Sequence, residues 1–307
     1  MSTLEPQRIL VTGGAGFIGS RLAKRHCPKT DVVVLDSLVS GDKATVPEEA
    51  EFIEGDIRDE SAVADAMAGV DCVFHEAALV SVDQSVAKPE TSHDHNVEGT
   101  LTILDAARNS DARVVLASSA AIYGHPERIP ISEDHPKEPT SPYGLDKLAC
   151  DHYARLYDEL YGVDALGLRY FNAYGPGQTG GDYAGVISVF IEQALADEDI
   201  TIHGEGDQTR DFVFIDDIVD ANLAAARTDY TGEGYNIGTG ESVTIRELAE
   251  LIQDVTDTDS DIVHTEPREG DIDRSRANVS KASEKLDFEA TVSLQKGLER
   301  TVEWFSE

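Results

Sequence analysis

Three regularly spaced glycines constrain the fold of this chain more than any other feature. Gly13, Gly16 and Gly19 follow a short apolar run and open a helical pattern. Glycines placed in this way let backbone amides approach a diphosphate at a helix N-terminus, where the helix dipole favours an anion. The strand before and the helix after them are the context that this mechanism requires, so the segment predicts a dinucleotide site rather than tight packing alone. Phe17 and Ile18 lie inside the same predicted cradle.

Acidic and small residues after the next strands extend this prediction. Asp36 closes the second predicted strand, where a carboxylate accepts both ribose hydroxyls of NAD and repels the 2′-phosphate of NADP, so NAD is the expected cofactor. Asp56 and Ile57 follow the third strand and could contact the adenine, although an acidic loop residue is as often simply solvated. Ala77 and Ala78 would let the cofactor lie close over the sheet, unless they only favour a helix.

The alternation of short apolar runs with helical patterns predicts an α/β fold, namely a Rossmann-like, doubly wound parallel sheet. Expected strands are 8–12, 31–36, 51–54, 72–75 and 113–118, and expected helices are 17–26, 60–67, 96–108 and 142–161. Strands at 165–170, 212–215 and 235–237 are expected to continue the sheet. Between and after them lie loops and helices at 175–183, 185–196, 244–254 and 294–304, which fit no βαβ repeat. We therefore expect an NAD-binding domain at 1–170, and at 171–307 mainly a smaller substrate-binding domain.

The net charge of −34, from 25 basic and 59 acidic residues, disfavours binding to nucleic acid. The acidic residues are spread along the chain and predict a solvated acidic surface. Self-repulsion of such a surface weakens at high ionic strength, so we expect a halophilic source, with an ordinary acidic protein as the alternative.

The chain has no apolar stretch of the ~20 residues that a membrane span needs, and its N-terminus does not resemble a signal peptide. We expect a cytoplasmic protein that does not bind membranes. Cys27, Cys72 and Cys150 are far apart within apolar patterns, which predicts buried free thiols and no metal site.

Tyr143 and Lys147 are four residues apart, so a helix would place them on one face. A neighbouring ammonium favours the phenolate form of a tyrosine, which can then act as a base. Ser119 ends the fifth strand at the edge where ligands of open α/β sheets bind, and its hydroxyl could steady the oxygen that loses the proton. The three residues predict a catalytic proton-transfer site.

With these residues, the chain resembles the extended short-chain dehydrogenase/reductase family, and within it the nucleotide-sugar epimerases. The resemblance covers nearly the whole chain. It includes the segments that begin Asn96-Val-Glu-Gly-Thr, Ser118-Ser-Ala-Ala-Ile-Tyr-Gly, Arg169-Tyr-Phe-Asn-Ala-Tyr-Gly-Pro, Gly206-Asp-Gln-Thr-Arg-Asp and Pro267-Arg-Glu-Gly-Asp.

The resemblance implies a role for each matching residue. Tyr143 would be the base, and Lys147 would hold the nicotinamide ribose and tune the tyrosine. Asn96, Ser118 and Tyr170 would belong to the cofactor site. The substrate would be a UDP-sugar, bound by Ser119 and Tyr143 together with Asn172 on its diphosphate, Arg210 and Arg268 on its phosphates, Asp271 near the uridine ribose, and Ser275 near the sugar.

Ala120 and Ala121 reduce the number of reactions of this family that the chain could catalyse. Dehydratases of the family carry an Asp-Glu pair directly after the catalytic serine or threonine, and decarboxylases keep a glutamate nearby. Here Ala120 and Ala121 occupy those places and cannot transfer protons. The pattern predicts 4-epimerisation by transient oxidation at C4. A UDP-glucuronate 4-epimerase or decarboxylase, a simple NAD-dependent dehydrogenase and a non-catalytic NAD-binding regulator remain as alternatives.

The resemblance implies that the position of Ser275 helps decide whether a C2 N-acetyl group fits, and a small residue there leaves room. We therefore expect UDP-glucose/UDP-galactose and, as a second pair, the N-acetylhexosamines. The resemblance also implies a homodimer through the helices at 96–108 and 142–161. Leu145, Leu148, Leu156 and Leu160 would permit it, although the same leucines could serve the core.

Overall fold

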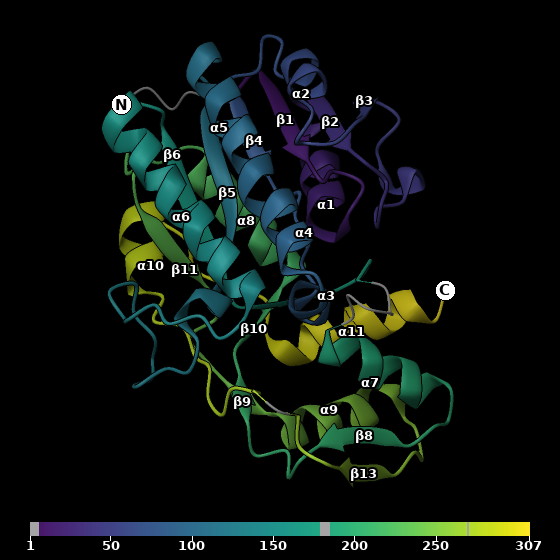
Figure 1. Cartoon of the computed structure of the whole chain (residues 1–307). Coiled ribbons are helices and arrows are strands. Elements are labelled where there is room, and N and C mark those ends of the chain that lie inside the picture. The colour runs from purple at the N-terminus through teal and green to yellow at the C-terminus, as the bar shows by residue number, and fades with distance from the viewer. Residues whose placement is uncertain (1–5, 179–184, 269) are drawn as a thin grey trace.

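The centre of the fold is a parallel sheet of seven strands. A computed structural model describes residues 6–178, 185–268 and 270–307 (Figure 1). The strands follow the order β11-β6-β5-β4-β1-β2-β3, and each neighbouring pair is parallel. In that order they are β11 (Gly234–Ile237), β6 (Ala165–Tyr170), β5 (Arg113–Ser119), β4 (Cys72–His75), β1 (Arg8–Thr12), β2 (Asp31–Asp36) and β3 (Glu51–Glu54). The predicted Rossmann-like, doubly wound sheet is confirmed.

Helices cover both faces of the sheet because its strands are apolar on both faces. Within β1, Leu10 belongs to one hydrophobic core, whereas Ile9 and Val11 belong to the core on the opposite face. The Leu10 side is covered by α2 (Glu60–Ala66), α5 (Gly99–Ser110) and α6 (Pro142–Tyr161). The other side is covered by α1 (Phe17–His26), α8 (Ile215–Ala225) and α10 (Ser280–Leu286).

A smaller layer lies beyond the carboxyl ends of the strands, at the bottom of Figure 1. Its helices are α7 (Val186–Leu195), α9 (Ile245–Thr256) and α11 (Leu294–Phe305). Its short strand pairs are β8 (Ile200–His203) with β13 (Ile262–Thr265), β9 (Thr209–Arg210) with β12 (Val243–Thr244), and β7 (Asn172–Tyr174) with β10 (Phe212–Phe214). One hydrophobic core runs from the α1 side of the sheet into this layer. A functional division of the chain near residue 170 stays a prediction.

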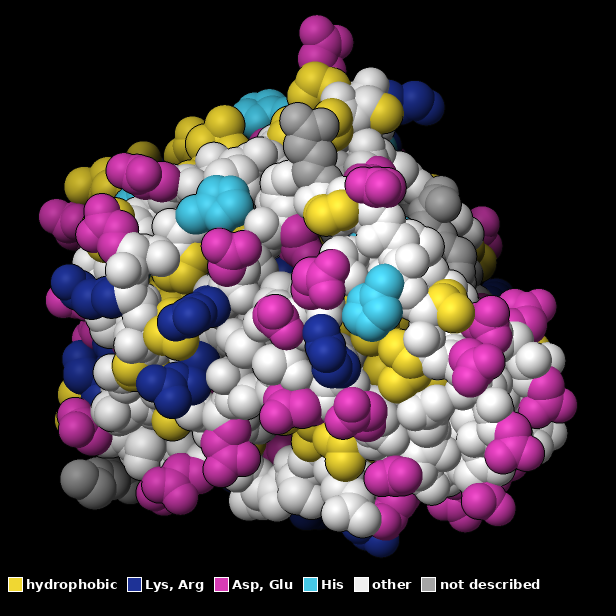
Figure 2. Space-filling view, turned by 90° about the horizontal axis from the view of Figure 1, so that it is seen from below, with side chains coloured by type: hydrophobic (Ala, Val, Ile, Leu, Met, Phe, Trp, Pro, Cys, Tyr) yellow, Lys and Arg dark blue, Asp and Glu magenta, His cyan; other side chains and the backbone are white. Residues whose placement is uncertain are grey.

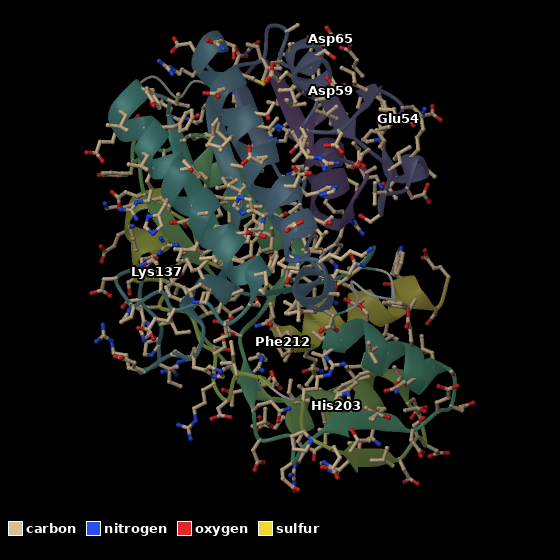
Figure 3. The ribbon with its side chains drawn as sticks, viewed as in Figure 1. Glu54, Asp59, Asp65, Lys137, His203 and Phe212 are labelled. Carbon is tan, nitrogen blue, oxygen red and sulfur yellow. The ribbon has the colours of Figure 1, made fainter. Side chains whose placement is uncertain are left out.

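One predicted strand does not join the main sheet. Residues 212–215 were expected to continue it, but β10 pairs only with β7, and Ile215 already begins α8. The preceding residue explains the displacement, because the buried carboxylate of Asp211 accepts hydrogen bonds from the backbone amides of Thr239, Gly240 and Ala277. The amides of Thr239 and Gly240 follow the end of β11, so they hold the start of β10 beside that edge strand. Phe212 lies where the two layers meet (Figure 3).

The helix predicted at 96–108 is also divided. A π-helical turn, η2 (Asp94–Glu98), precedes α5, and two short helices come before it, α3 (Val82–Ala87) and α4 (Pro89–His93). The Asn96 carbonyl accepts hydrogen bonds from the hydroxyl of Thr100 and the thiol of Cys150. Such side-chain competition for a helix carbonyl is not visible in a hydrophobic pattern. Two 3₁₀ turns, η1 (Lys43–Thr45) and η3 (Ala120–Tyr123), complete the described elements.

Several other predictions can be compared with the structure. Cys72 and Cys150 are buried free thiols, and Cys27 is half-buried. Of the loop predicted at 175–183, residues 179–183 lie outside the described residues. Among the residues that the structure describes, none of the helices combines the length and apolar character needed to cross a membrane. Figure 2 shows acidic side chains scattered over the face seen from below, as the even spread of acid along the chain predicts.

Candidate active site

The glycine loop is folded too tightly to accept side chains. Gly13 has a φ of +67°, and a Cβ there would lie 2.8 Å from the Cα of Ala77. A Cβ on Gly19 would lie 2.2 Å from the carbonyl oxygen of Gly13. The N-cap of α1 is Gly16, which has no side chain to cap the first amides of the helix. The loop therefore leaves helix N–H groups free for an anionic ligand, which is the cradle that a diphosphate needs.

Asp36 is a buried carboxylate at the end of β2, beside this loop. Its two oxygens accept backbone N–H groups from Ala15, at 2.9 Å, and from Leu38, at 2.8 Å. These bonds hold the side chain beside the loop that carries the glycines. Each carboxylate oxygen can accept more than one hydrogen bond, so the group retains capacity for ribose hydroxyls. The loop and Asp36 together fit NAD.

The segment after β4 is held in place by hydrogen bonds from the side chains of Asn96 and Thr12. The buried Asn96 amide accepts the Leu79 N–H, at 2.8 Å, and donates to the Leu79 carbonyl, at 3.1 Å. The Ala77 N–H donates to Thr12 Oγ1 at 3.3 Å. These bonds set the path of residues 77–79 over the edge of the sheet. Asn96 thus supports this segment, and its direct contact with a cofactor stays a prediction, as does that of Ala78.

The carboxylate of Asp56 is bound by the guanidinium of Arg58. Arg58 binds both carboxylate oxygens of Asp56 and also pairs with Asp94. The hydrogen bond from Arg58 lowers the pKa of the Asp56 carboxyl. Ile57 is buried and packs against Gly99, where a Cβ would come within 2.4 Å of it. A role for Asp56 and Ile57 at the adenine stays a prediction.

Ser119 and Tyr143 are brought together by direct contact between the turns that carry them. Ser119 caps η3 and accepts the Ala121 N–H at 3.1 Å. Tyr143 lies in the first turn of α6, and its own N–H donates to the hydroxyl of Ser85 in α3 at 3.1 Å. A Cβ on the next residue, Gly144, would lie only 2.8 Å from the Ala121 carbonyl oxygen. The missing side chain at this position allows the two turns to meet.

Lys147 lies one turn further along α6 and is almost fully buried. Its ammonium donates to the carbonyl of Ala117 in β5 at 2.7 Å. His75 lies at the end of β4. Burial, and to a smaller extent the positive charge of Lys147, lowers the pKa of His75 to about 3. His75 is therefore neutral, and it bridges Thr12 and Thr100. The ammonium of Lys147 is thus a cation one helical turn from the candidate base, Tyr143.

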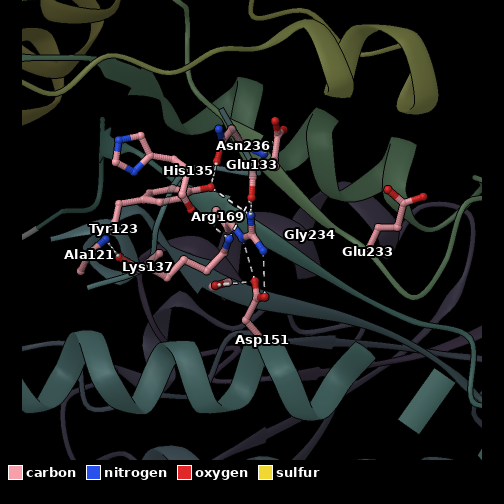
Figure 4. Close-up of polar contacts among 12 residues, drawn as sticks. Ala121, Tyr123, Glu133, His135, Lys137, Asp151, Arg169, Glu233, Gly234 and Asn236 are labelled. Carbon is pink, nitrogen blue, oxygen red and sulfur yellow. Dashed lines mark hydrogen bonds and ion pairs between the residues drawn. The ribbon is translucent and has the colours of Figure 1, made fainter. Parts of the chain in front are cut away.

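A buried ion pair fixes α6 against the sheet, and sequence reasoning did not identify it as part of the site. Arg169 donates to both oxygens of Asp151 at 2.9 Å, and Ser118 donates to the same carboxylate at 3.2 Å. Arg169 also donates to Tyr123, whose hydroxyl donates to Asn236 (Figure 4). Asp151 is four residues beyond Lys147, so the spacing of Tyr143, Lys147 and Asp151 was the available signal.

A second group missed from sequence is Glu76. It follows β4, and its carboxyl group accepts the Tyr170 hydroxyl at 2.9 Å. Asn222 of α8 in turn donates to that hydroxyl at 2.7 Å. Burial raises the pKa of Glu76 to about 7, although the Tyr170 hydrogen bond and Lys147 oppose the shift. The Tyr170 side chain is therefore bound by Glu76 and Asn222, and its place in the cofactor site stays a prediction.

Arg210 and Asp271, which were predicted to bind a phosphate and a ribose, form an ion pair with each other. Arg210 lies on β9, and its guanidinium is largely buried. Asp271 follows a turn in which its N–H approaches the Arg268 carbonyl at 3.4 Å. The Arg268 side chain is exposed. The structure therefore brings Arg210 and Asp271 together, and the contact of Arg268 with a phosphate stays a prediction.

Asn172 and Ser275 lie on neighbouring segments beyond the sheet. The Asn172 amide donates to the Asp211 carbonyl at 3.0 Å, next to Arg210. Ser275 is buried, and its N–H donates to the Thr209 carbonyl at 3.0 Å. Both contacts attach these residues to the segment around β9. Their contact with a substrate stays a prediction.

Comparison with known proteins shows the family of this chain. Residues 9–238 match the model of the NAD dependent epimerase/dehydratase family. A UDP-N-acetyl-alpha-D-glucosaminuronate decarboxylase of Bacillus cytotoxicus is 35% identical and covers 98% of this chain. The crystal structure of Thermotoga maritima UDP-glucose 4-epimerase with UDP-glucose is 37% identical, has a TM-score of 0.94, and covers 97% of this chain and 98% of its own.

A further solved structure widens the range of relatives. A UDP-N-acetylglucosamine 4-epimerase from Methanobrevibacter ruminantium, in complex with UDP-N-acetylmuramic acid, is 35% identical, has a TM-score of 0.95, and covers 99% of each chain. The chain belongs to the NAD dependent epimerase/dehydratase family. Its cofactor is NAD, in agreement with the glycine loop and Asp36.

Proposed function

We propose that this protein is a UDP-sugar 4-epimerase with tightly bound NAD. The observation that carries the proposal is the composition of the turn after Ser119. Ala120 and Ala121 follow it directly, and the Ala121 N–H is bound by the Ser119 hydroxyl. No side chain at these two positions can add or remove a proton. A site with one base and no acid in this turn suits oxidation and re-reduction at C4 better than loss of water.

Each residue then has a defined task. Tyr143 takes the proton of the C4 hydroxyl, and Ser119 donates a hydrogen bond to the same oxygen. Lys147, held by the Ala117 carbonyl, supplies a positive charge one helical turn from Tyr143. When bound, NAD accepts the C4 hydride and returns it. The 4-keto sugar rotates in the site and presents the opposite face of C4. Tyr143 then gives the proton back, so no net proton or hydride leaves the site.

The substrate side supports a nucleoside diphosphate as the handle of the sugar. Arg210 is a largely buried cation in a chain that is poor in cations, and a guanidinium binds phosphate oxygens with two N–H groups. Asp271 beside it can accept ribose hydroxyls. We expect UDP-glucose and UDP-galactose as substrates, and the N-acetylhexosamine pair as the second choice because Ser275 is small. A hexuronate is the alternative, with Arg210 or another cation on its carboxylate.

The decisive experiment is a coupled assay of the purified protein with UDP-galactose at high salt and without added NAD. Conversion to UDP-glucose without steady growth of the NADH absorbance band supports epimerisation. Stoichiometric NADH would identify a dehydrogenase instead, and release of carbon dioxide from UDP-glucuronate would identify a decarboxylase. A protein that binds NAD but converts neither these sugars nor UDP-N-acetylglucosamine would favour the non-catalytic regulator.

The matched variants are Tyr143→Phe and Tyr153→Phe, which remove one hydroxyl each from the same helix. Tyr143→Phe should lose activity by at least about 100-fold and still bind NAD, because only the proton transfer is removed. Tyr153→Phe should retain activity. An active Tyr143→Phe variant is incompatible with the proposed base.

We also propose that the protein forms a homodimer through α5 and α6. Three of the four leucines singled out in the sequence are exposed on α6, namely Leu145 at 58%, Leu156 at 42% and Leu160 at 62%. Leu148 packs instead against a small core beside the substrate side. An open cavity of about 960 Å³ lies between α4 and the start of α6 and includes Leu145 in its lining. Large apolar side chains along one helix are typical of a contact surface.

A further inference from the structure

Glu76 lies between the two halves of the cofactor site. Along the carboxyl edge of the sheet, Asp36 ends β2, the glycine loop follows β1, Glu76 follows β4, and Ser119 ends β5. A dinucleotide with its diphosphate at the glycine loop must cross the end of β4 to reach Ser119. Its nicotinamide half therefore passes Glu76.

Backbone contacts fix Glu76 against the glycine loop. Its N–H donates to the Thr12 carbonyl at 3.2 Å, which extends the pairing of β4 with β1. A Cβ on Gly13 would lie 3.0 Å from the carbonyl carbon of Glu76. The side chain cannot swing far, because Tyr170 donates to its carboxyl group at 2.9 Å and is itself held by Asn222.

The charged and titratable groups around Glu76 come from three elements. Lys147 of α6 is the cation that acts on it, and Tyr170 of β6 is its hydrogen-bonding partner. Burial raises the pKa of Tyr170 well above 10, so this phenol is neutral near pH 7. His75 on the same strand is neutral, because burial lowers its pKa to about 3. Among the described side chains that act on Glu76, Lys147 is thus the cationic one, and Lys147 is already bound to the Ala117 carbonyl.

We propose that Glu76 is a positioning residue for the nicotinamide end of NAD and that its carboxylate makes the protein favour the oxidised cofactor. The oxidised nicotinamide ring carries a positive charge and the reduced ring carries none. A fixed carboxylate near the ring therefore stabilises the oxidised form selectively. For an epimerase this bias has a use, since each cycle must end with oxidised cofactor. The inference rests on NAD binding and not on the identity of the sugar.

The test compares affinities for the two redox forms of the cofactor and needs no sugar. Full-length wild type and Glu76→Gln, each with its bound cofactor, are equilibrated with mixtures of NAD and NADH, and the ratio of the two bound forms gives the ratio of their dissociation constants. Glutamine keeps the size of the side chain and an oxygen that can accept the Tyr170 hydroxyl. We expect the ratio of the two dissociation constants to shift about tenfold towards NADH, which corresponds to about 1.4 kcal/mol.

A control variant separates a local effect of the charge from a general one. Glu54→Gln makes the same substitution at the end of β3, a strand at the edge of the sheet. Glu54→Gln should keep the wild-type ratio within about twofold. A Glu76→Gln ratio equal to that of wild type would overturn the proposal, and so would an equal shift in Glu54→Gln.

A measurement on wild type keeps the test independent of how well the variant folds. Burial raises the pKa of Glu76 to about 7, so the carboxylate is largely neutralised at about pH 6 and largely ionised at about pH 8. The preference of wild type for NAD over NADH should therefore increase with pH across this interval. A ratio that stays constant would contradict the charge effect, and the Glu76→Gln ratio should be constant.

Discussion

The ammonium of Lys147 donates a hydrogen bond to the backbone carbonyl of Ala117, 30 residues away in the chain, at 2.7 Å. This bond attaches the first turns of α6 to β5, the strand that ends at Ser119. The contact holds a positive charge next to the turn of Tyr143. It also leaves the ammonium with further N–H groups, because a lysine has three donors.

Replacing this ammonium should abolish most of the activity. Lys147→Met preserves much of the side-chain volume and removes the charge, so we expect a loss in kcat of at least about 100-fold together with weaker NAD binding. Lys296→Met is the control, because Lys296 is 66% exposed on α11. Steady-state rates with UDP-galactose and titration with NAD measure both effects. Wild-type kcat in Lys147→Met would show that the charge is dispensable.

The pair between Asp151 and Arg169 should dominate the electrostatic part of stability near the site. Both side chains are at most 2% exposed. Asp151→Ala leaves a buried guanidinium without its carboxylate, which should lower the free energy of unfolding by about 3 to 5 kcal/mol. Glu51→Ala breaks an exposed pair with Arg8 and should cost about 1 kcal/mol or less. Urea unfolding at high salt measures both. Equal losses would contradict this ranking.

The pair of Asp151 and Arg169 also predicts that acid lowers the stability of the folded protein. Burial opposes ionisation of Asp151, but the hydrogen bonds and charge of Arg169 outweigh it, so the pKa of Asp151 is lowered. A lowered folded-state pKa stabilises the protein above the unfolded value of about 4, and this contribution is lost as the pH falls through the folded value. Wild type should therefore lose more stability on acidification than Asp151→Asn. Parallel stability curves for the two proteins below about pH 4 would argue against it.

Salt should stabilise the folded protein. The net charge of −34 repels itself in a compact state, and the screening length falls from about 10 Å at 0.1 M to about 3 Å at 1 M salt. We expect the melting temperature to rise between these concentrations with sodium chloride, as the halophilic interpretation requires. Sucrose at matched osmolality is the control. A melting temperature that is flat or falls with salt would favour the ordinary acidic protein.

The size of residue 275 should select the sugar. Ser275→Tyr places a bulky ring at a buried position on the predicted sugar side, so activity on UDP-N-acetylglucosamine should fall at least about tenfold more than activity on UDP-glucose. Ser280→Tyr, at the exposed start of α10, should leave the ratio unchanged. The ratio of kcat/KM for the two sugars is the measurement. A proportional loss on both sugars would mean that Ser275 does not face C2.

The dimer should depend on the exposed face of α6. A charge placed in an apolar contact is desolvated without a partner, so Leu156→Glu with Leu160→Glu should give a monomer in light scattering at high salt. Leu195→Glu is the control, because Leu195 is 41% exposed on α7. A monomeric wild type, or a dimer that survives both changes on α6, would exclude this interface.

Much of the fold follows from local patterns. The predicted strands at 8–12, 31–36 and 51–54 coincide with β1, β2 and β3, and the predicted helix at 142–161 coincides with α6. Ser141 caps that helix through its hydroxyl, and Gly162 ends it in the left-handed conformation. These features depend on residues a few positions apart, so the sequence displays them directly. The position of β10 depends instead on what Asp211 binds, and a local pattern does not contain that information.

The glycine cradle, the carboxylate at Asp36 and the placement of Tyr143 and Lys147 along one helix could all be predicted from the sequence. Each rests on spacing within a strand, a turn or a helix. The hydrogen bond from Tyr170 to Glu76, 94 residues earlier, and the pairing of Arg169 with Asp151 could not, because they join elements that are distant in the chain. Local periodicity sets where strands and helices form, whereas the order of strands in the sheet sets which side chains are buried together.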